Sequence, residues 1–334
     1  MVNNAKSHAA KNASEMAISI ANKKAIAGDP YFKLIVRNMD GPWGNGSKEA
    51  VNLIFEEKVW ALMGSHDGRN AHLVEQVIAK INIPFLSAWA SDPTLSQAFV
   101  PWYFSCVPNT NQQAEAFIKN TKNSNNLNKI AIVLDESYDS KLFLKSLLKE
   151  IKKVGGNDPL QLILTNSQKN YNLLIKKIRE AKIRQIILLG EPLKALNFLE
   201  ELRENEINLS IYGGLSLLAE EEYDDNFRIE IYDNITVPTS GNWLDKKPLS
   251  FKNEYYKRYN KVPGAIAVYA YDGMNLILES IKLSGFDRTK IQKYLSKIRF
   301  KGVTGDVQFD KRGNRLNATE MFKINNGIPV IVDK

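Results

Sequence analysis

The segment VWALMGSHDGRNAHLVEQVIAKINIPFLSAW, residues 59–89, gives the clearest indication of the fold class. It contains two apolar, β-rich runs at 59–64 and 83–89, separated by an amphipathic helical pattern at 71–81. Apolar strands that alternate with amphipathic helices are typical of a parallel sheet covered on both faces. The segment therefore predicts a parallel α/β unit.

The same alternation continues along most of the chain. Further strands are predicted at 32–39, 103–108, 129–135, 160–165, 184–190 and 209–214. Further helices are predicted at 47–57, 111–121, 139–154 and 192–205. Residues 302–334 form two hairpin-like patterns, in which Asn326-Gly327 is a strong tight-turn signal. A helical pattern at 3–25 precedes every predicted strand, which is unusual for such a fold.

Two changes in composition divide the chain, whose 334 residues are about twice a usual domain. The asparagine-rich segment TKNSNNLNK at 121–129 separates two strand–helix series, and a second change lies near 237–243. We therefore predict two lobes of similar architecture with the chain crossing between them. The first comprises residues 1–120 and 241–316, and the second 121–240 and 317–334.

Composition excludes several classes of protein. The net charge of +8 is spread over lysines interleaved with glutamates, so no nucleic-acid partner is predicted. Cys106 is the only cysteine, which excludes an intrachain disulfide and a cysteine-based zinc site. No apolar run reaches the length of a membrane span. The N-terminus lacks the apolar core of a signal peptide, so we expect either a cytoplasmic protein or a leader already removed.

The loop after the strand at 59–64 is the first candidate site, because ligands of open α/β sheets lie beyond the carboxyl ends of the strands. Ser65 and the backbone amides entering the next helix could hold an anion, or Ser65 and Asp67 could simply cap that helix. His66 and Asp67 lack a neighbouring nucleophile, and the serine hydrolase motif GxSxG is absent. His66 and His72 lack metal-ligand spacing, so neither a catalytic nor a metal residue is predicted.

Other strand ends supply further candidates. Trp89 follows the strand at 83–89 and either stacks on a ligand or packs beneath its loop. Tyr138 and Glu191 follow the strands at 129–135 and 184–190. A carboxylate such as Glu191 would suit a cationic amine, or it only complements the dipole of the helix that follows.

The order and spacing of five segments resemble those of the type I periplasmic binding fold. Within that fold they are most similar to the branched-chain amino acid and amide binding proteins of ABC transporters. The segments are VWALMGS (59–65), IPFLSAWASDPTL (83–95), IAIVLDESYDSKL (130–142), IAVYAYDGMNLILESI (266–281) and GVTGDVQFDKRGN (302–314). Together they cover nearly the whole chain.

The resemblance implies two Rossmann-like lobes with mostly parallel sheets, joined by a hinge, that close on a ligand. It implies that the loop containing Ser65, His66 and Asp67 grips a ligand carboxylate. It also implies that the loop of Trp89, Ala90 and Ser91 offers a carbonyl and a hydroxyl, and that Tyr138 closes from the second lobe.

The chain departs from that pattern in two places. Amino-acid binders of this family carry an acidic residue after the strand at 209–214, to pair with the ligand ammonium. Here that place reads Gly214, Leu215 and Ser216, so Glu191 or Asp67 would have to substitute. The family also opens on a strand, which the first lobe is predicted to lack. Such a gap would leave backbone groups in the core unpaired.

These observations predict an extracytoplasmic solute-binding protein. It would capture a small polar molecule, such as an amino acid, an amide or a small carboxylate, and deliver it to the membrane permease of an ABC transporter. We expect a monomer without cofactor. The alternatives are a sensory ligand-binding module of the same fold, a scaffold that no longer binds ligand, or a hydrolase using His66 and Asp67.

Overall fold

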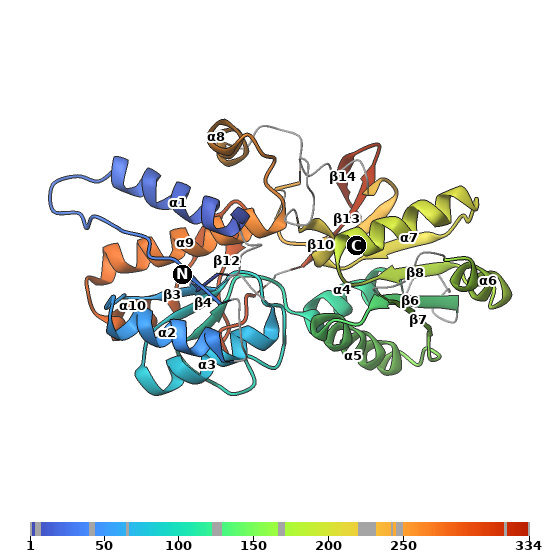
Figure 1. Cartoon of the computed structure of the whole chain (residues 1–334), viewed down its shortest axis with the longest axis horizontal. Helices are drawn as coiled ribbons and strands as arrows, with labels where there is room; N and C mark the ends of the chain where they lie inside the picture. The colour runs from blue at the N-terminus through green and yellow to red at the C-terminus, as the bar shows by residue number, and fades with distance from the viewer. Residues whose placement is uncertain are drawn as a thin grey trace. The chain divides into compact units, whose positions relative to one another are not determined.

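The chain divides into two compact units, each assembled from separate stretches of sequence. A computed structural model describes residues 2–3, 8–39, 44–64, 67–121, 129–165, 171–219, 232–241, 243–244, 250–316 and 319–332 (Figure 1). Unit 1 comprises Met1–Asn109, Ser240–Trp243 and Lys247–Ala318. Unit 2 comprises Thr110–Thr239, Leu244–Lys246 and Thr319–Lys334.

Unit 1 contains a parallel sheet between two layers of helices (Figure 1). Its strands, in the order β2-β1-β3-β4-β5 within the described residues, are Arg37–Asn38, Val2–Asn3, Leu62–Gly64, Phe85–Ser87 and Tyr103–Ser105. Helices α1 (His8–Lys23) and α9 (Ala265–Ser284) lie on one side of this sheet, and α2 (Asn45–Phe55) and α3 (Gly68–Ile81) lie on the other. Unit 1 also contains α8, α10, β11 and β12, which span Ser250–Tyr259, Arg288–Leu295, Phe300–Gly302 and Gly305–Val307.

The predicted absence of a first strand is wrong. Strand β1 lies between β2 and β3 and pairs in parallel with both, through Val2 with Arg37 and Val2 with Gly64. Two residues are too few to produce an apolar run, which is why the sequence pattern missed this strand. Strand β2 also has only two residues, although the sequence predicted a strand at 32–39. A ladder of paired strands extends only as far as the shorter strand, and the partner of β2 is the two-residue β1.

Unit 2 contains a larger mixed sheet. Its strands follow the order β14-β13-β10-β9-β8-β6-β7 within the described residues, and those from β6 to β10 are parallel. In chain order they are Ile130–Asp135, Leu160–Leu164, Gln185–Leu188, Ser210–Gly213, Ile235–Thr239, Glu320–Asn325 and Ile328–Ile331. Strand β10 falls where the sequence indicated only a change in composition. The helices are α4 (Thr110–Thr121), α5 (Tyr138–Lys153), α6 (Asn172–Glu180) and α7 (Pro192–Glu204), with a 3₁₀ turn at Leu215–Leu218.

Helix α4 belongs to unit 2, although the sequence-based boundary at 120 placed it in the first lobe. Its apolar face, including Phe117 and Ile118, packs into the core formed by Ile132, Phe143 and Leu147. The polar segment at 121–129 therefore lies inside unit 2 and does not separate the units. The two C-terminal hairpins are confirmed, as β11–β12 and β13–β14. Asn326 and Gly327 both have the positive φ of a tight hairpin turn.

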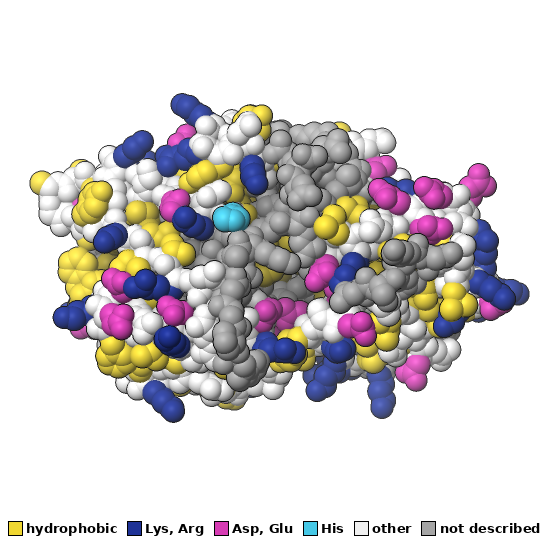
Figure 2. Space-filling view, in the orientation of Figure 1, with side chains coloured by type: hydrophobic (Ala, Val, Ile, Leu, Met, Phe, Trp, Pro, Cys, Tyr) yellow, Lys and Arg dark blue, Asp and Glu magenta, His cyan; other side chains and the backbone are white. Residues whose placement is uncertain are grey.

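The charged side chains are dispersed over the surface, as the sequence predicted. Figure 2 shows lysine and arginine side chains scattered over the visible face, without one basic patch. Among the described residues, no helix is long and apolar enough to cross a membrane.

Candidate functional site

The carboxyl ends of β3 and β4 lead into the candidate loops of unit 1. Ser65 and His66 lie outside the described residues, so their predicted roles stay predictions. Asp67 caps helix α3: one carboxylate oxygen accepts from the Asn70 backbone N–H at 2.9 Å, and the other accepts from its side-chain amide at 3.1 Å. Both oxygens of Asp67 therefore hold the helix start in place.

The loop after β4 contains Trp89, Ala90 and Ser91. Ala90 is buried, whereas Trp89 and Ser91 are half-buried. The loop begins close to β3, because the Ala88 backbone N–H donates to the Gly64 carbonyl at 2.8 Å. The two candidate loops of unit 1 therefore start from adjacent strand ends. Whether Trp89 stacks on a ligand stays a prediction.

A charged cluster, in which Asp92 and Glu75 are buried and His72 is half-buried, joins helix α3 to the loop after β4. His72, in the second turn of α3, contacts Asp92 from the β4 loop, with 3.0 Å between Nε2 and Oδ2. Its other ring nitrogen, Nδ1, lies 3.1 Å from Oε2 of Glu75, one turn further along the helix. Asp92 also accepts from the backbone N–H and the hydroxyl of Thr94, at 2.8 and 2.6 Å. The helix that follows β3 is thereby fixed to the loop that follows β4.

The charges in this cluster stabilise one another. Hydrogen bonds from His72 to Asp92 and Glu75 raise the pKa of His72 from 6.5 to about 9, so its imidazole is cationic at neutral pH. Burial alone would raise the pKa of Asp92, but hydrogen bonds from His72 and Thr94 outweigh burial and lower it. The sequence identified His72 only as a poor metal ligand and did not link it to Asp92. Their spacing of twenty residues gave no signal of contact.

Unit 2 has a comparable buried carboxylate at the end of β6. Asp135 accepts from the backbone N–H of Ser137 at 3.1 Å and from its hydroxyl at 2.6 Å. Its other oxygen accepts from the backbone N–H of Glu191, at 2.9 Å, in the loop after β8. Burial would raise the pKa of Asp135, but hydrogen bonds from Ser137, Ser140 and the backbone lower it. Asp135 thus joins two neighbouring strand-end loops, a role that the sequence did not indicate.

The predicted site residues of unit 2 differ in exposure. Tyr138 is half-buried and begins α5. Glu191 is exposed and forms an ion pair with Lys194, 2.7 Å away. Leu215 is buried, and its backbone N–H donates to the side-chain oxygen of Gln113 at 3.1 Å. Glu191, which precedes α7, thus already has a cationic partner in the first turn of that helix.

Replacing Gly190 by alanine is expected to destabilise unit 2 by about 2–3 kcal/mol. Gly190 has a φ of +107°, and a Cβ there would lie 2.5 Å from the carboxyl carbon of Asp135. Gly155 is a matched control, because its φ is +74° but a Cβ added to it would meet no atom within 4 Å. Gly155→Ala should cost only the backbone strain, about 1 kcal/mol. Urea denaturation measures both; equal losses would contradict the predicted contact with Asp135.

No group of three or more His, Cys, Asp or Glu side chains in the described part of the chain is arranged to hold a metal ion. Instead, His72 forms ion pairs with both Glu75 and Asp92.

Comparison with known families gives one match that spans nearly the whole chain. The family described as "Receptor family ligand binding region" matches residues 9–327. Among curated proteins, Glutamate receptor 3.7 of Arabidopsis thaliana is 30% identical over 111 residues, which are 33% of this chain and 12% of the receptor. Glutamate receptor 3.4 of the same plant is 22% identical over 324 residues, covering 85% of this chain and 34% of the receptor. The chain thus spans about a third or less of these relatives.

Solved structures share the fold over the full chain. A branched-chain amino acid transporter substrate binding protein of Streptococcus pneumoniae, in complex with isoleucine, has a TM-score of 0.81 at 19% identity, covering 100% of this chain and 98% of that one. A solute binding protein of R. palustris, in complex with benzoate, has a TM-score of 0.81 at 14% identity, covering 99% and 94%. An ABC transporter substrate-binding protein of Sphaerobacter thermophilus reaches 0.84 at 13% identity, covering 99% and 95%. The type I periplasmic binding fold is therefore confirmed.

Proposed function

Because the chain belongs to the receptor family ligand binding region family, we propose that it is a small-molecule binding protein and not an enzyme. The ligand contacts come from the strand-end loops of both units, with Ser65, His66, Asp67, Trp89, Ala90 and Ser91 from unit 1 and Tyr138, Glu191 and Leu215 from unit 2.

One observation carries this proposal: in each unit a buried carboxylate fixes a strand-end loop to a neighbouring element, helix α3 in unit 1 and a second strand-end loop in unit 2. Asp92 contacts His72 in unit 1, and Asp135 accepts from the Glu191 backbone in unit 2. Loops fixed before a ligand arrives lose less conformational entropy on binding, which increases affinity. Structural neighbours that are solute-binding proteins support the same conclusion.

The proposed ligand is a small carboxylate or amide, ahead of a free amino acid. Gly214, Leu215 and Ser216 supply no carboxylate for an ammonium group. The two substitutes are engaged, because Asp67 caps α3 and Glu191 pairs with Lys194. An amino acid would therefore have to displace an existing contact to gain a charge partner.

The proposed setting is extracytoplasmic, with a monomer delivering its ligand to an ABC-type permease. The solved neighbours that are ABC transporter proteins support this setting. Sensing is the second candidate function, because the curated relatives are named as glutamate receptors.

The test is a thermal-shift screen of the purified chain against carboxylates, amides, amino acids and polyols. A ligand at 100 times its Kd should add about 2.7 kcal/mol, which raises Tm by several degrees. We expect selective shifts with carboxylates or amides. A response to amino acids alone would contradict the proposed ligand class, and no response to any compound would contradict the binding function.

Two tryptophan variants test whether a ligand found in the screen binds at the strand-end loops. Trp89→Ala should reduce the affinity for a ligand found in the screen about tenfold, because the loss of one aromatic contact costs about 1.4 kcal/mol. Trp60→Ala should leave this affinity unchanged. Trp60 is 40% exposed and packs on Phe286, away from the strand-end loops. Equal effects of the two substitutions would contradict a ligand contact by Trp89.

A further inference from the structure

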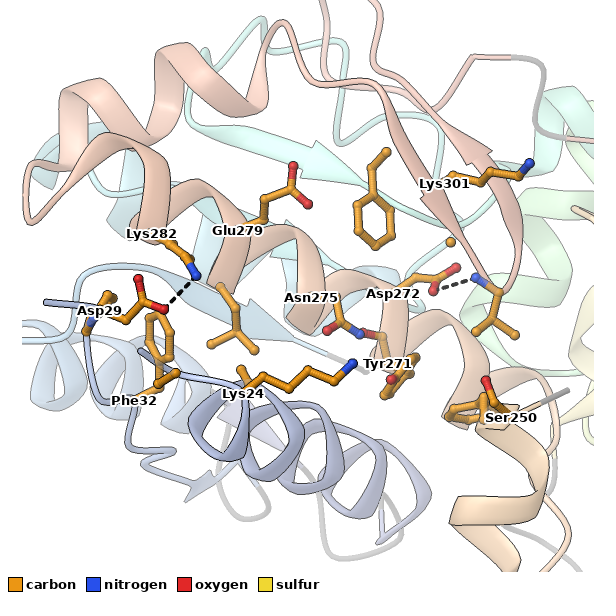
Figure 3. Close-up of a pocket in the computed structure, with 18 residues that line it drawn as sticks. Lys24, Asp29, Phe32, Ser250, Tyr271, Asp272, Asn275, Glu279, Lys282 and Lys301 are labelled. Carbon is orange, nitrogen blue, oxygen red and sulfur yellow. Dashed lines mark hydrogen bonds and ion pairs between the residues drawn. The ribbon is translucent and has the colours of Figure 1, made fainter. Parts of the chain in front are cut away.

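Unit 1 contains a groove of about 590 Å³ bordered by α1, the segment after it, α8, α9 and β11 (Figure 3). Helix α9 contributes one stripe of side chains to it, at spacings of four, three and four residues: Tyr271, Asn275, Leu278 and Lys282. The opposite side of α9 faces the sheet, since a Cβ on Gly273 would lie 2.7 Å from Leu86. None of the lining residues belongs to the loops after β3 or β4.

The groove is large enough for a small organic molecule and has an apolar lining. Pockets for such ligands typically measure about 300–1,000 Å³. Phe32, Leu278 and Phe300 line the groove, and Phe251 packs against Tyr271 with ring centroids 4.6 Å apart. These side chains can contact the apolar body of a ligand.

The carboxylates that line the groove are already engaged. Asp29 forms an ion pair with Lys282 at 2.7 Å, and Glu279 accepts from the Tyr294 hydroxyl at 3.0 Å. Asp272 is buried and accepts from the backbone N–H groups of residues 303 and 304, at 2.8 and 2.7 Å. A cationic ligand would therefore have to compete with existing partners of each carboxylate.

Lys24 differs from these groups. Within the described residues, its ammonium group has no ion pair, and Figure 3 shows its side chain extending along the groove toward Tyr271 and Asn275. An ammonium group beside an apolar lining matches a molecule with a carboxylate at one end and an apolar body at the other.

We propose that this groove is a second binding site, separate from the strand-end loops, for a small carboxylate with an aromatic or aliphatic body. Lys24 pairs with the carboxylate, and Phe32, Leu278 and Phe300 pack against the body. The protein would then bind a ligand in this groove independently of the ligand at the strand-end loops.

The probe for this site is phenylacetate, with phenethylamine as its control of opposite charge. Isothermal titration calorimetry should show saturable binding of phenylacetate, and binding of phenethylamine at least about tenfold weaker. Lys24→Ala should weaken phenylacetate binding about tenfold, as expected for the loss of one charge-assisted contact. Lys80→Ala removes the same charge from an exposed position in the last turn of α3 and should leave affinity unchanged.

A further variant separates the two proposed sites. Trp89→Ala should leave phenylacetate binding intact if the probe occupies the groove. Loss of binding in Trp89→Ala but not in Lys24→Ala would place the probe at the strand-end loops and overturn the proposal. Absence of saturable phenylacetate binding, or equal weakening by Lys24→Ala and Lys80→Ala, would overturn it as well. None of these outcomes shows whether the strand-end loops bind a ligand. The thermal-shift screen tests that proposal separately, with the ligands that it finds.

Discussion

The free energy of unfolding is expected to fall by about 2 kcal/mol between about pH 6.5 and pH 9.5 through His72 alone. The pKa of His72 is about 9 in the folded chain and 6.5 as its ordinary value. A pKa raised by folding stabilises the protein fully below the unfolded value, and that stabilisation is lost as pH rises through the folded value. The whole difference between the two pKa values would correspond to about 3 kcal/mol, which the 31% exposure of the His72 side chain reduces through solvent screening.

At acidic pH the stability contribution of the same cluster depends on pH in the opposite direction. The pKa of Asp92 lies below 3.8 in the folded chain, so its contribution is present above pH 3.8 and is lost as the solution becomes more acidic. The cluster is therefore most stabilising between about pH 4 and about pH 6.5. Glu75 and Thr94 also face His72, and nearby Tyr103 has a pKa raised by burial far above this range.

His72→Gln isolates this contribution, because glutamine keeps hydrogen-bonding capacity without the titrating charge. Urea denaturation of both proteins at about pH 6.5, 8 and 9.5 should show a stability difference that shrinks as pH rises. A difference that stays constant with pH would show that His72 contributes by packing and not by charge. Because the cluster joins the α3 start to the β4 loop, the variant should also increase hydrogen exchange in residues 88–92.

The fold could be predicted from the sequence because most strands and helices are long enough to show a periodic pattern. The strand at 130–135 is buried along its whole length, and α3 buries Ala71, Val74 and Ile78 on one face. Strand β1 was missed because two residues have no period. Helix α4 was assigned to the wrong lobe because the polar segment after it looked like a domain linker.

The candidate site could be predicted only as a set of loops. Strand ends are visible in the sequence, and ligands of such sheets lie near them. The contacts that fix the loops are not visible, because His72 and Asp92 are twenty residues apart and Asp135 contacts the Glu191 backbone 56 residues away. Such pairs follow from the order of the strands in the sheet, which no local pattern encodes.

Arg315 makes the most extensive buried polar contacts described in unit 1, and its removal should have the largest effect on stability. Its side chain is 1% exposed, and one guanidinium nitrogen donates to the Cys106 carbonyl at 3.0 Å and to the Thr304 hydroxyl at 2.8 Å. The second donates to the carbonyls of Thr304 and Asp306, at 2.6 and 3.0 Å. Arg315 thereby joins the end of β5 to the β11–β12 hairpin.

Arg315→Ala is expected to lower the free energy of unfolding by about 3–5 kcal/mol, since it leaves several buried acceptors without a donor. It also removes the cation near Asp272, whose pKa burial already raises. Arg315→Lys keeps the charge but not the planar fork, so it should cost about 2–3 kcal/mol. Urea denaturation measures both, and the lysine variant keeps the comparison possible if the alanine variant does not fold.

Arg312 provides the matched control three residues away. It is exposed, and its guanidinium lies 4.4 Å from the centre of the Phe99 ring. Arg312→Ala should cost less than about 1 kcal/mol, the usual value of an exposed cation–π contact. If Arg315→Ala and Arg312→Ala had equal effects, the contacts of Arg315 would contribute no more than a surface charge does. The expected order is Arg315→Ala, then Arg315→Lys, then Arg312→Ala, because buried acceptors without donors cost more than an exposed contact that water replaces.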